Sequence, residues 1–165
     1  MDFTILCDTR EQKNFHITRY FDREDIKYAN KKLDVGDYTI GIIEKEEKVC
    51  FEDIIVVERK GSGDTGLDEL AVNLTKKRKQ FVRELDNDIE LHLVIEDGTW
   101  EKLFKGQYRS EMNTNSYVAS LMTFLHRYNI HIHMVERKNT GKWMYNLFYY
   151  YLRERGKKNG NTNSR

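Results

Sequence analysis

The sequence has no proline, only two cysteines, no apolar run long enough to cross a bilayer, and a net charge of only +1. The lack of a long apolar run excludes a transmembrane helix, and no signal peptide is present, so we expect a soluble, cytoplasmic protein with no membrane partner. Two lone cysteines, Cys7 and Cys50, suit a reducing compartment, where they serve as small core residues.

The small net charge would argue against a nucleic-acid partner, because phosphate binding depends on lysine and arginine. The charges are segregated, however. Acidic residues gather at residues 22–25, 44–47 and 86–90, whereas five basic residues crowd one predicted helix. They are Lys76, Lys77, Arg78, Lys79 and Arg83. A metal-using nuclease needs both signs, carboxylates for the ion and basic residues for the DNA backbone.

With 165 residues, of which 39% are apolar, the chain fits a single folded domain. We place that domain at residues 1–155 and expect a disordered tail, rich in Gly, Asn, Ser and Lys, at residues 156–165. A hairpin in the first half and strand–helix alternation later predict an α/β fold with a mixed central sheet flanked by helices. Helices are expected at residues 15–21, 67–85, 100–104, 116–128 and 143–152, and strands at residues 3–7, 26–33, 54–60, 90–95 and 130–135.

The predicted central strand ends in charged residues. Four branched apolar residues, 54–57, leave neither face polar, which is typical of a strand buried on both sides. The period of two then puts Glu58 and Lys60 on one face and Arg59 on the other. A metal-dependent phosphodiesterase places a Mg²⁺ ligand beside a cation that steadies the attacking water in this way.

The Glu-x-Lys triplet alone is weak, because it occurs four times, starting at Glu11, Glu46, Glu58 and Glu136. Residues 135–138 even repeat the letters of residues 57–60. Only Glu58 has a Gly-Asp-Tyr turn before it and a basic amphipathic helix after it. An isolated triplet is more often an exposed ion pair.

Two more carboxylates stand near predicted strand ends, where open α/β sheets collect their ligands. Asp8 follows the first strand, and Asp37 follows Gly36, which supplies a turn or bulge that re-aims the carboxylate.

Four blocks in this order resemble the nuclease domain of the XPF family of structure-specific endonucleases, a branch of the restriction-endonuclease-like PD-(D/E)XK superfamily. They are Asp-Thr-Arg-Glu at residues 8–11, Val-Gly-Asp-Tyr at 35–38, Val-Glu-Arg-Lys at 57–60 and the basic helix at 74–85. Beyond residue 85 only the order of strands and helices is similar. The family's helix-hairpin-helix module is absent from the sequence.

The resemblance implies a catalytic role for five residues. Asp37, Glu58 and the carbonyl group of Arg59 would bind Mg²⁺ or Mn²⁺, and Lys60 would orient the attacking water or stabilise charge on phosphorus. Asp8 would take a supporting or second-metal role, and the Arg59 side chain would contact phosphate or the acidic cluster. The implied DNA-binding residues are Arg10, Lys76, Lys77, Arg78, Lys79 and Arg83.

The family's motif ends with an acidic residue four positions after the lysine, which by spacing is Asp64. The downstream pattern instead aligns Asp68 or Glu69, as if residues 61–66 held an insertion. All three stay candidates.

Three other features have more than one interpretation. The basic run at residues 76–79 could be a phosphate-binding face, a solvated helix surface or a nuclear import signal. His131 and His133 share a strand face and could hold a metal, but the sequence offers no third ligand nearby and favours an exposed sheet face. The apolar stripe of residues 143–152 fits a core, and in the family it also fits a homodimer surface.

The sequence thus predicts a Mg²⁺- or Mn²⁺-dependent DNA endonuclease that cuts branched or partly single-stranded DNA in repair or recombination. The alternatives are a non-catalytic DNA-binding partner subunit of the same fold and a sequence-specific restriction-type nuclease. The small size resembles trimmed viral or prophage versions.

Overall fold

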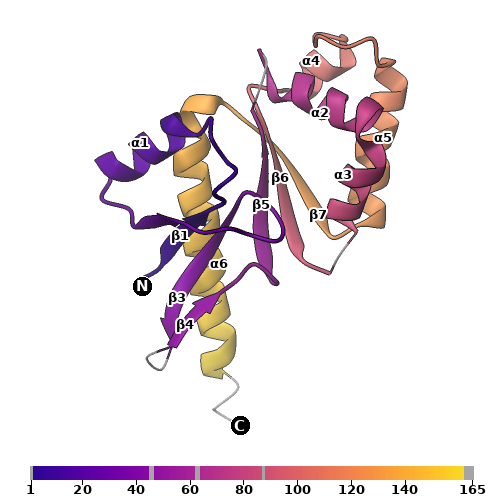
Figure 1. Ribbon diagram of the computed structural model, residues 1–165. Coiled ribbons are helices and arrows are strands. Elements are labelled where there is room, and N and C mark those ends of the chain that lie inside the picture. Colours follow the sequence, from indigo (N-terminus) through magenta and orange to yellow (C-terminus); the bar gives the residue numbers. More distant parts are fainter. Residues whose placement is uncertain (1, 45–46, 62–63, 87, 162–165) are drawn as a thin grey trace.

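A computed structural model describes residues 2–44, 47–61, 64–86 and 88–161 (Figure 1). Within these residues the strands form one seven-stranded sheet. The strands are β1 (Thr4–Cys7), β2 (Tyr28–Asn30), β3 (Tyr38–Glu44), β4 (Glu47–Cys50), β5 (Ile55–Lys60), β6 (Glu90–Glu96) and β7 (Ile130–Val135). The helices are α1 (Phe15–Arg23), α2 (Gly66–Lys76), α3 (Arg78–Leu85), α4 (Trp100–Phe104), α5 (Thr114–Arg127), the short 3-10 helix η1 (Arg137–Asn139) and α6 (Thr140–Asn161).

The sheet is mixed, as the sequence predicts. Its strand order is β2-β1-β3-β5-β6-β7, and β4 pairs with β3 off this path. Strand β3 runs antiparallel to β1, β4 and β5, whereas β5, β6 and β7 are parallel. The antiparallel half follows from the β3–β4 hairpin, and the parallel half from strands that alternate with helices.

Helices cover both faces of the sheet (Figure 1). One core lies between the sheet and helices α2 to α5, and a second lies between the sheet and helices α1 and α6. Central strand β5 contributes to both cores, because Val56 packs on the first side and Ile55 and Val57 on the second. The expectation of a strand buried on both faces is therefore confirmed for residues 55–57. Ile54 is 37% exposed, because a tight turn in which the N–H groups of Ile54 and Ile55 donate to the Phe51 carbonyl precedes the strand.

The largest differences from the predicted helix bounds occur in two of the predicted helices. The helix expected at residues 67–85 is two helices, because Lys77 leaves helical geometry with φ −125° and ψ 20°. Neither glycine nor proline marks that break, and Leu74 and Phe81 on either side of it still reach the same core. Helix α6 begins at Thr140 and runs to Asn161. Residues 156–161 belong to this helix, whereas we predict a disordered tail there. Apolar spacing could not show this, since the apolar stripe stops at Leu152.

Three predictions fall partly outside the described residues. They concern the hairpin tip at residues 45–46, the glycine loop at residues 62–63 and the tail at residues 162–165. The strand expected at residues 26–33 is shorter, with only β2 in the sheet. Among the described residues, none of the helices combines the length and apolar character that a bilayer crossing needs.

Candidate nuclease site

An open hollow of about 780 Å³ lies where the turn at residues 34–37, the end of β5 and helices α2 and α3 meet. Its lining includes both predicted metal-binding carboxylates, the predicted lysine and several polar residues of the two helices. A second hollow of about 330 Å³ extends from the same carboxylates over residues 10–13. The first hollow, called the hollow from here on, is lined by Arg10, Asp37, Glu58, Lys60, Glu69, Asn73, Lys77, Gln80, Arg83 and Glu84, among others.

Asp37 is fastened to β5 by backbone and side chain. Its N–H donates to the Val57 carbonyl at 2.8 Å, and its Oδ2 accepts from the Arg59 N–H at 2.7 Å. Strand β3 pairs with β5 at Tyr38 and Val57. Beyond that pair, the Asp37 side chain, rather than a β3 backbone carbonyl, accepts the hydrogen bond from the Arg59 N–H. Gly36 permits this approach, because its φ is +73° and a Cβ there would stand 2.8 Å from the Cβ of Val56.

Glu58 and Lys60 lie side by side, as the period of two predicts. Lys60 Nζ donates to Glu58 Oε1 at 2.6 Å. Their side chains are 13% and 7% exposed, so they are partly shielded rather than a solvated pair. The Lys60 ammonium also lies 5.2 Å from the centre of the Phe81 ring, which belongs to α3. Helix α3 therefore forms the wall against which the lysine rests.

Burial shifts the pKa values of the ionisable groups in the site. Burial, followed by the nearby Glu58 and Glu11 carboxylates, raises the pKa of Asp37 well above its usual value. Burial also raises the pKa of Glu58, although Lys60 opposes that shift. Burial disfavours the Lys60 charge, but Glu58 outweighs it and raises the pKa of Lys60 to about 12. Two carboxyl groups whose ionisation is disfavoured by burial therefore lie beside one charged lysine.

Arg59 points away from these groups, toward the opposite face of β5. It makes two hydrogen bonds to Glu11, at 2.6 and 3.1 Å, and one to Glu96 at 2.9 Å. The Glu96 carboxylate is fully buried and also meets His16 at 2.6 Å and Arg137 at 3.3 Å. Of the two partners that the resemblance implies for the Arg59 side chain, the structure therefore pairs it with the acidic cluster.

A family model described as the ERCC4 domain matches residues 7–147, which is most of the chain. The chain belongs to the ERCC4 domain family. The XPF-like nuclease resemblance in the sequence is thereby confirmed, and the family is one of nucleases. A comparison with curated protein sequences finds no match.

Two solved structures share the fold of this ERCC4 domain. XPF from Aeropyrum pernix superposes with a TM-score of 0.65 at 20% identity, covering 93% of this chain and 63% of the other. XPF from Aeropyrum pernix in complex with DNA gives a TM-score of 0.64 at 18% identity, covering 93% of this chain and 66% of the other. The expected restriction-endonuclease-like fold is confirmed. The chain spans about two thirds of the length of these proteins.

Asp8 lies in the ERCC4 domain at the end of β1, and the structure occupies both of its oxygens. The carboxylate is buried and accepts hydrogen bonds from the Arg10 N–H, the Arg10 guanidinium and the Leu33 N–H, at 2.7 to 2.9 Å. Burial alone would raise its pKa, but these donors lower the pKa of Asp8 to about 2. Among the described residues, Asp8 does not line either hollow, whereas Arg10 lines both. The observed contacts make Asp8 the anchor that holds Arg10 at the site.

The three candidate acidic residues have different surroundings. The Glu69 carboxylate lines both hollows, accepts from the Gly61 N–H at 2.9 Å and lies 3.9 Å from Lys60 Nζ. Asp68 instead caps the start of α2, accepting from the N–H groups of Asp64, Thr65 and Arg109. Asp64 is exposed and forms an ion pair with Arg109. Only Glu69 among these three stands beside Lys60 in the described part of the chain.

The predicted basic residues also divide. Lys77 and Arg83 line the hollow, together with Arg10. Arg78 instead lies over the Phe124 ring and donates to Ser120 at 3.1 Å. Lys76 and Lys79 are exposed but do not line the hollow. The repeated motif at Glu136 lies after β7, where Glu136 forms an exposed ion pair with Lys138 at 2.8 Å and lines neither of the two hollows.

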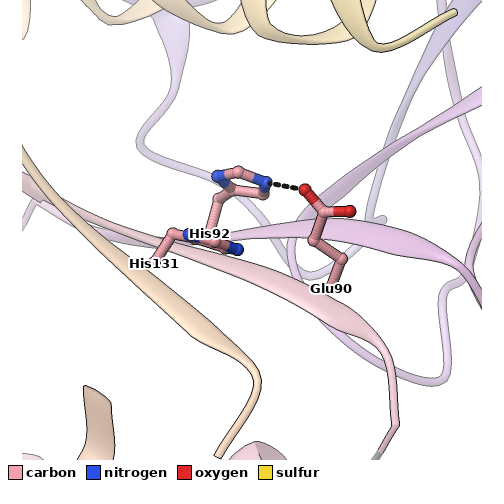
Figure 2. A group of neighbouring side chains, drawn as sticks. All are labelled: Glu90, His92 and His131. Carbon is pink, nitrogen blue, oxygen red and sulfur yellow. Dashed lines mark hydrogen bonds and ion pairs between the residues drawn. The ribbon is translucent and has the colours of Figure 1, made fainter. Parts of the chain in front are cut away.

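The surroundings of the two β7 histidines differ from the prediction. His131 was expected to lack a third ligand nearby, yet the structure places Glu90 and His92 of β6 beside it (Figure 2). His133 is covered by the Trp143 ring at 4.7 Å and so is not on a bare sheet face. Burial lowers the pKa of both His92 and His133 to about 4, so these rings are neutral at neutral pH. Sequence reasoning missed the group because it depends on the register of β6 against β7.

Proposed function

We propose that this chain is a divalent-metal-dependent endonuclease that hydrolyses phosphodiester bonds in branched or partly single-stranded DNA. The observation that carries this proposal is the convergence of the Asp37 and Glu58 carboxylates with the Lys60 ammonium in one open hollow. Membership of the ERCC4 domain family supports the nuclease part.

The donor set fits Mg²⁺ or Mn²⁺. Asp37, Glu58 and the Arg59 carbonyl group would hold the ion, and all three offer the hard oxygen ligands that these cations prefer. Burial raises the pKa values of Asp37 and Glu58, and a bound divalent cation would favour their ionised forms. A bound divalent ion supplies Lewis acidity and stabilises negative charge that develops on the phosphate. Glu69 stands close enough to Lys60 to serve as a further acidic group of the site.

The chain's own residues would position the reactants. The Lys60 ammonium stays protonated, because Glu58 raises its pKa, so it can donate hydrogen bonds to the attacking water or to a phosphate oxygen but cannot accept a proton. Glu58 holds the Lys60 Nζ in place at 2.6 Å. Asp37 is fixed by the Arg59 N–H. Such fixed donors and acceptors lower the reorganisation needed during cleavage.

DNA would enter through the hollow between the turn at residues 34–37 and helix α3. Arg10, Lys77 and Arg83 provide positive charge on its lining and would contact backbone phosphates. A structure of XPF from Aeropyrum pernix in complex with DNA has this fold, which supports DNA as the partner.

A cleavage panel tests the proposal. Purified protein is incubated with flap, fork, four-way junction and linear duplex DNA, first with Mn²⁺ or Mg²⁺ and then with EDTA. Metal-dependent cuts near the junctions, lost in EDTA and in Asp37→Asn, are the expected result. Binding without cleavage on every substrate would contradict the proposal in favour of a non-catalytic module. Cuts at one sequence of linear duplex would indicate a restriction-type nuclease instead.

A homodimer through the C-terminal helices also stays a proposal. Met144, Phe148 and Leu152 of the α6 stripe are buried in the chain's own core, whereas Tyr150, at 47% exposed, is the large apolar side chain that α6 exposes within the part whose side chains are described. Light scattering at several protein concentrations would test dimer formation, and Tyr150→Glu should shift any dimer to monomer.

A further inference from the structure

A second group of metal-ligating side chains lies on the face of the sheet that carries α6. One ligand atom from each of Glu90, His92 and His131 can be chosen so that all three lie within 4.8 Å of one another (Figure 2). His92 Nε2 is 3.0 Å from Glu90 Oε1, and the rings of His92 and His131 stack at 4.8 Å. Two imidazoles and a carboxylate form a different donor set from the all-oxygen set of the nuclease site.

Sheet register builds this group. His92 and His131 are directly paired residues of the parallel strands β6 and β7, and Glu90 precedes His92 by two positions, so it projects from the same face. Position 90 pairs with Ile55 of β5, whereas Lys60 of the nuclease site pairs with Ile95. Five residues of strand, about 16 Å, separate the two positions along the sheet. The group is therefore distinct from the nuclease site.

The surroundings of His92 suit a metal ligand. Its Nδ1 lies 2.9 Å from His133 Nε2, and the His133 ring rests against Trp143 at 4.7 Å. A hydrogen bond from the second ring nitrogen is the usual support that orients a metal-binding histidine. The His92 Nε2 then faces Glu90 Oε1, at 3.0 Å. Burial keeps the His92 side chain in one orientation, while His131 is exposed and admits an ion from solvent.

We propose that Glu90, His92 and His131 bind a transition-metal ion of the Zn²⁺ class. Nitrogen and carboxylate ligands favour Zn²⁺ and its neighbours over Mg²⁺, and three protein ligands leave a fourth position for water or a small ligand. The ion links β6 to β7, which is the last strand in the order of the sheet, and so stabilises that edge.

Co²⁺ and Zn²⁺ titrations test the proposal. The full chain carries Asp37→Asn and Glu58→Gln, so that the nuclease-site carboxylates contribute no binding. The expected result is one equivalent of Co²⁺ with the visible absorption of a four-coordinate site, displaced by one equivalent of Zn²⁺, together with a Zn²⁺-dependent rise in Tm. Adding His131→Ala should abolish the absorption and the rise in Tm. Adding His126→Ala, which removes an exposed histidine of α5, should change neither.

Misfolding is separated from loss of a ligand by the metal-free Tm, which should be the same in the His131→Ala and His126→Ala proteins because both side chains are exposed. Glu90→Gln gives a second variant and should lower Zn²⁺ affinity at least tenfold. Absence of stoichiometric Co²⁺ binding in the parent protein would overturn the proposal. So would equal Zn²⁺ affinity with and without His131.

Discussion

The Arg59 N–H donates a 2.7 Å hydrogen bond to the Asp37 carboxylate, so a residue of the predicted metal site also completes the backbone pairing of the central strand. Replacing Asp37 by asparagine keeps an oxygen acceptor for that N–H but removes the negative charge. We expect Asp37→Asn to lower the cleavage rate at least about 100-fold. We also expect its metal-free Tm to equal or exceed that of the parent, because burial disfavours the Asp37 charge. Glu136→Gln, in the repeated motif, should cut normally, and a requirement for Glu136 would show that the site is misplaced.

Metal binding should stabilise the protein in a pH-dependent way. The pKa values of Asp37 and Glu58 are raised in the folded state, so without metal these groups favour the fold as pH falls and weaken it as pH rises through those values. Mg²⁺ binds their ionised forms. The difference in Tm with and without Mg²⁺ should therefore be largest at neutral and higher pH and shrink on acidification.

Asp8 has the opposite pH dependence, since its pKa is lowered to about 2 and its contribution is lost only as pH falls from about 4 toward that value. Asp8 stays ionised at the higher pH values both with and without Mg²⁺. Its contribution to stability therefore cancels from the difference in Tm between the two conditions. Thermal scans of the parent and of Asp37→Asn at several pH values would measure the Mg²⁺-dependent change in Tm. An equal change in both proteins would count against the proposed ligands.

Glu69 and Asp64 can be told apart by matched substitutions. Glu69→Gln removes a carboxylate that lies 3.9 Å from Lys60 Nζ, so we expect about a tenfold or greater fall in cleavage rate. Asp64→Asn changes an exposed residue paired with Arg109 and should leave the rate within about twofold. The reverse order in single-turnover cleavage would assign the acidic position to Asp64.

Basic residues should differ in their effect on DNA binding according to whether they line the hollow. Lys77→Ala and Arg83→Ala should each weaken binding and reduce the salt slope by about 1, as expected for one lost phosphate contact. Lys79→Ala is the matched control, because Lys79 is equally exposed but lies off the hollow. Binding isotherms at several salt concentrations, in Ca²⁺ to prevent cleavage, would give the slopes. Equal losses in all three variants would favour a merely diffuse charge effect.

The buried ion cluster around Arg59 should matter for stability. Glu96→Gln leaves the Arg59 and Arg137 guanidinium groups without a fully buried carboxylate, and removal of one partner from such a cluster costs about 3 kcal/mol of unfolding free energy. Glu136→Gln breaks an exposed pair and should cost less than about 0.5 kcal/mol. Urea unfolding would measure both, and similar small values would show that Arg59 is adequately held by Glu11 alone.

Much of this site could be predicted from local sequence. Residues 57–60 fix the faces of Glu58, Arg59 and Lys60 by strand alternation alone, and Gly36 marks the turn before Asp37. The rest depends on contacts between distant segments. Asp8 resembles a metal ligand in sequence, but the Leu33 N–H and Arg10 occupy its oxygens, and spacing could not choose between Asp64, Asp68 and Glu69. The break at Lys77 and the histidine group need helix packing and strand register, which one sequence does not show.

The alternation of charged side chains between the two faces of β5 bears on the stability of the metal-free protein. Glu58 and Lys60 face the open hollow, whereas Arg59 on the reverse side is neutralised by Glu11 and Glu96. Strand alternation thus separates Arg59 and its carboxylate partners from the Glu58–Lys60 pair, although Glu11 stays near enough to Asp37 to raise the pKa of that carboxyl group. The metal-free protein should therefore be fully folded and able to bind metal and DNA in either order.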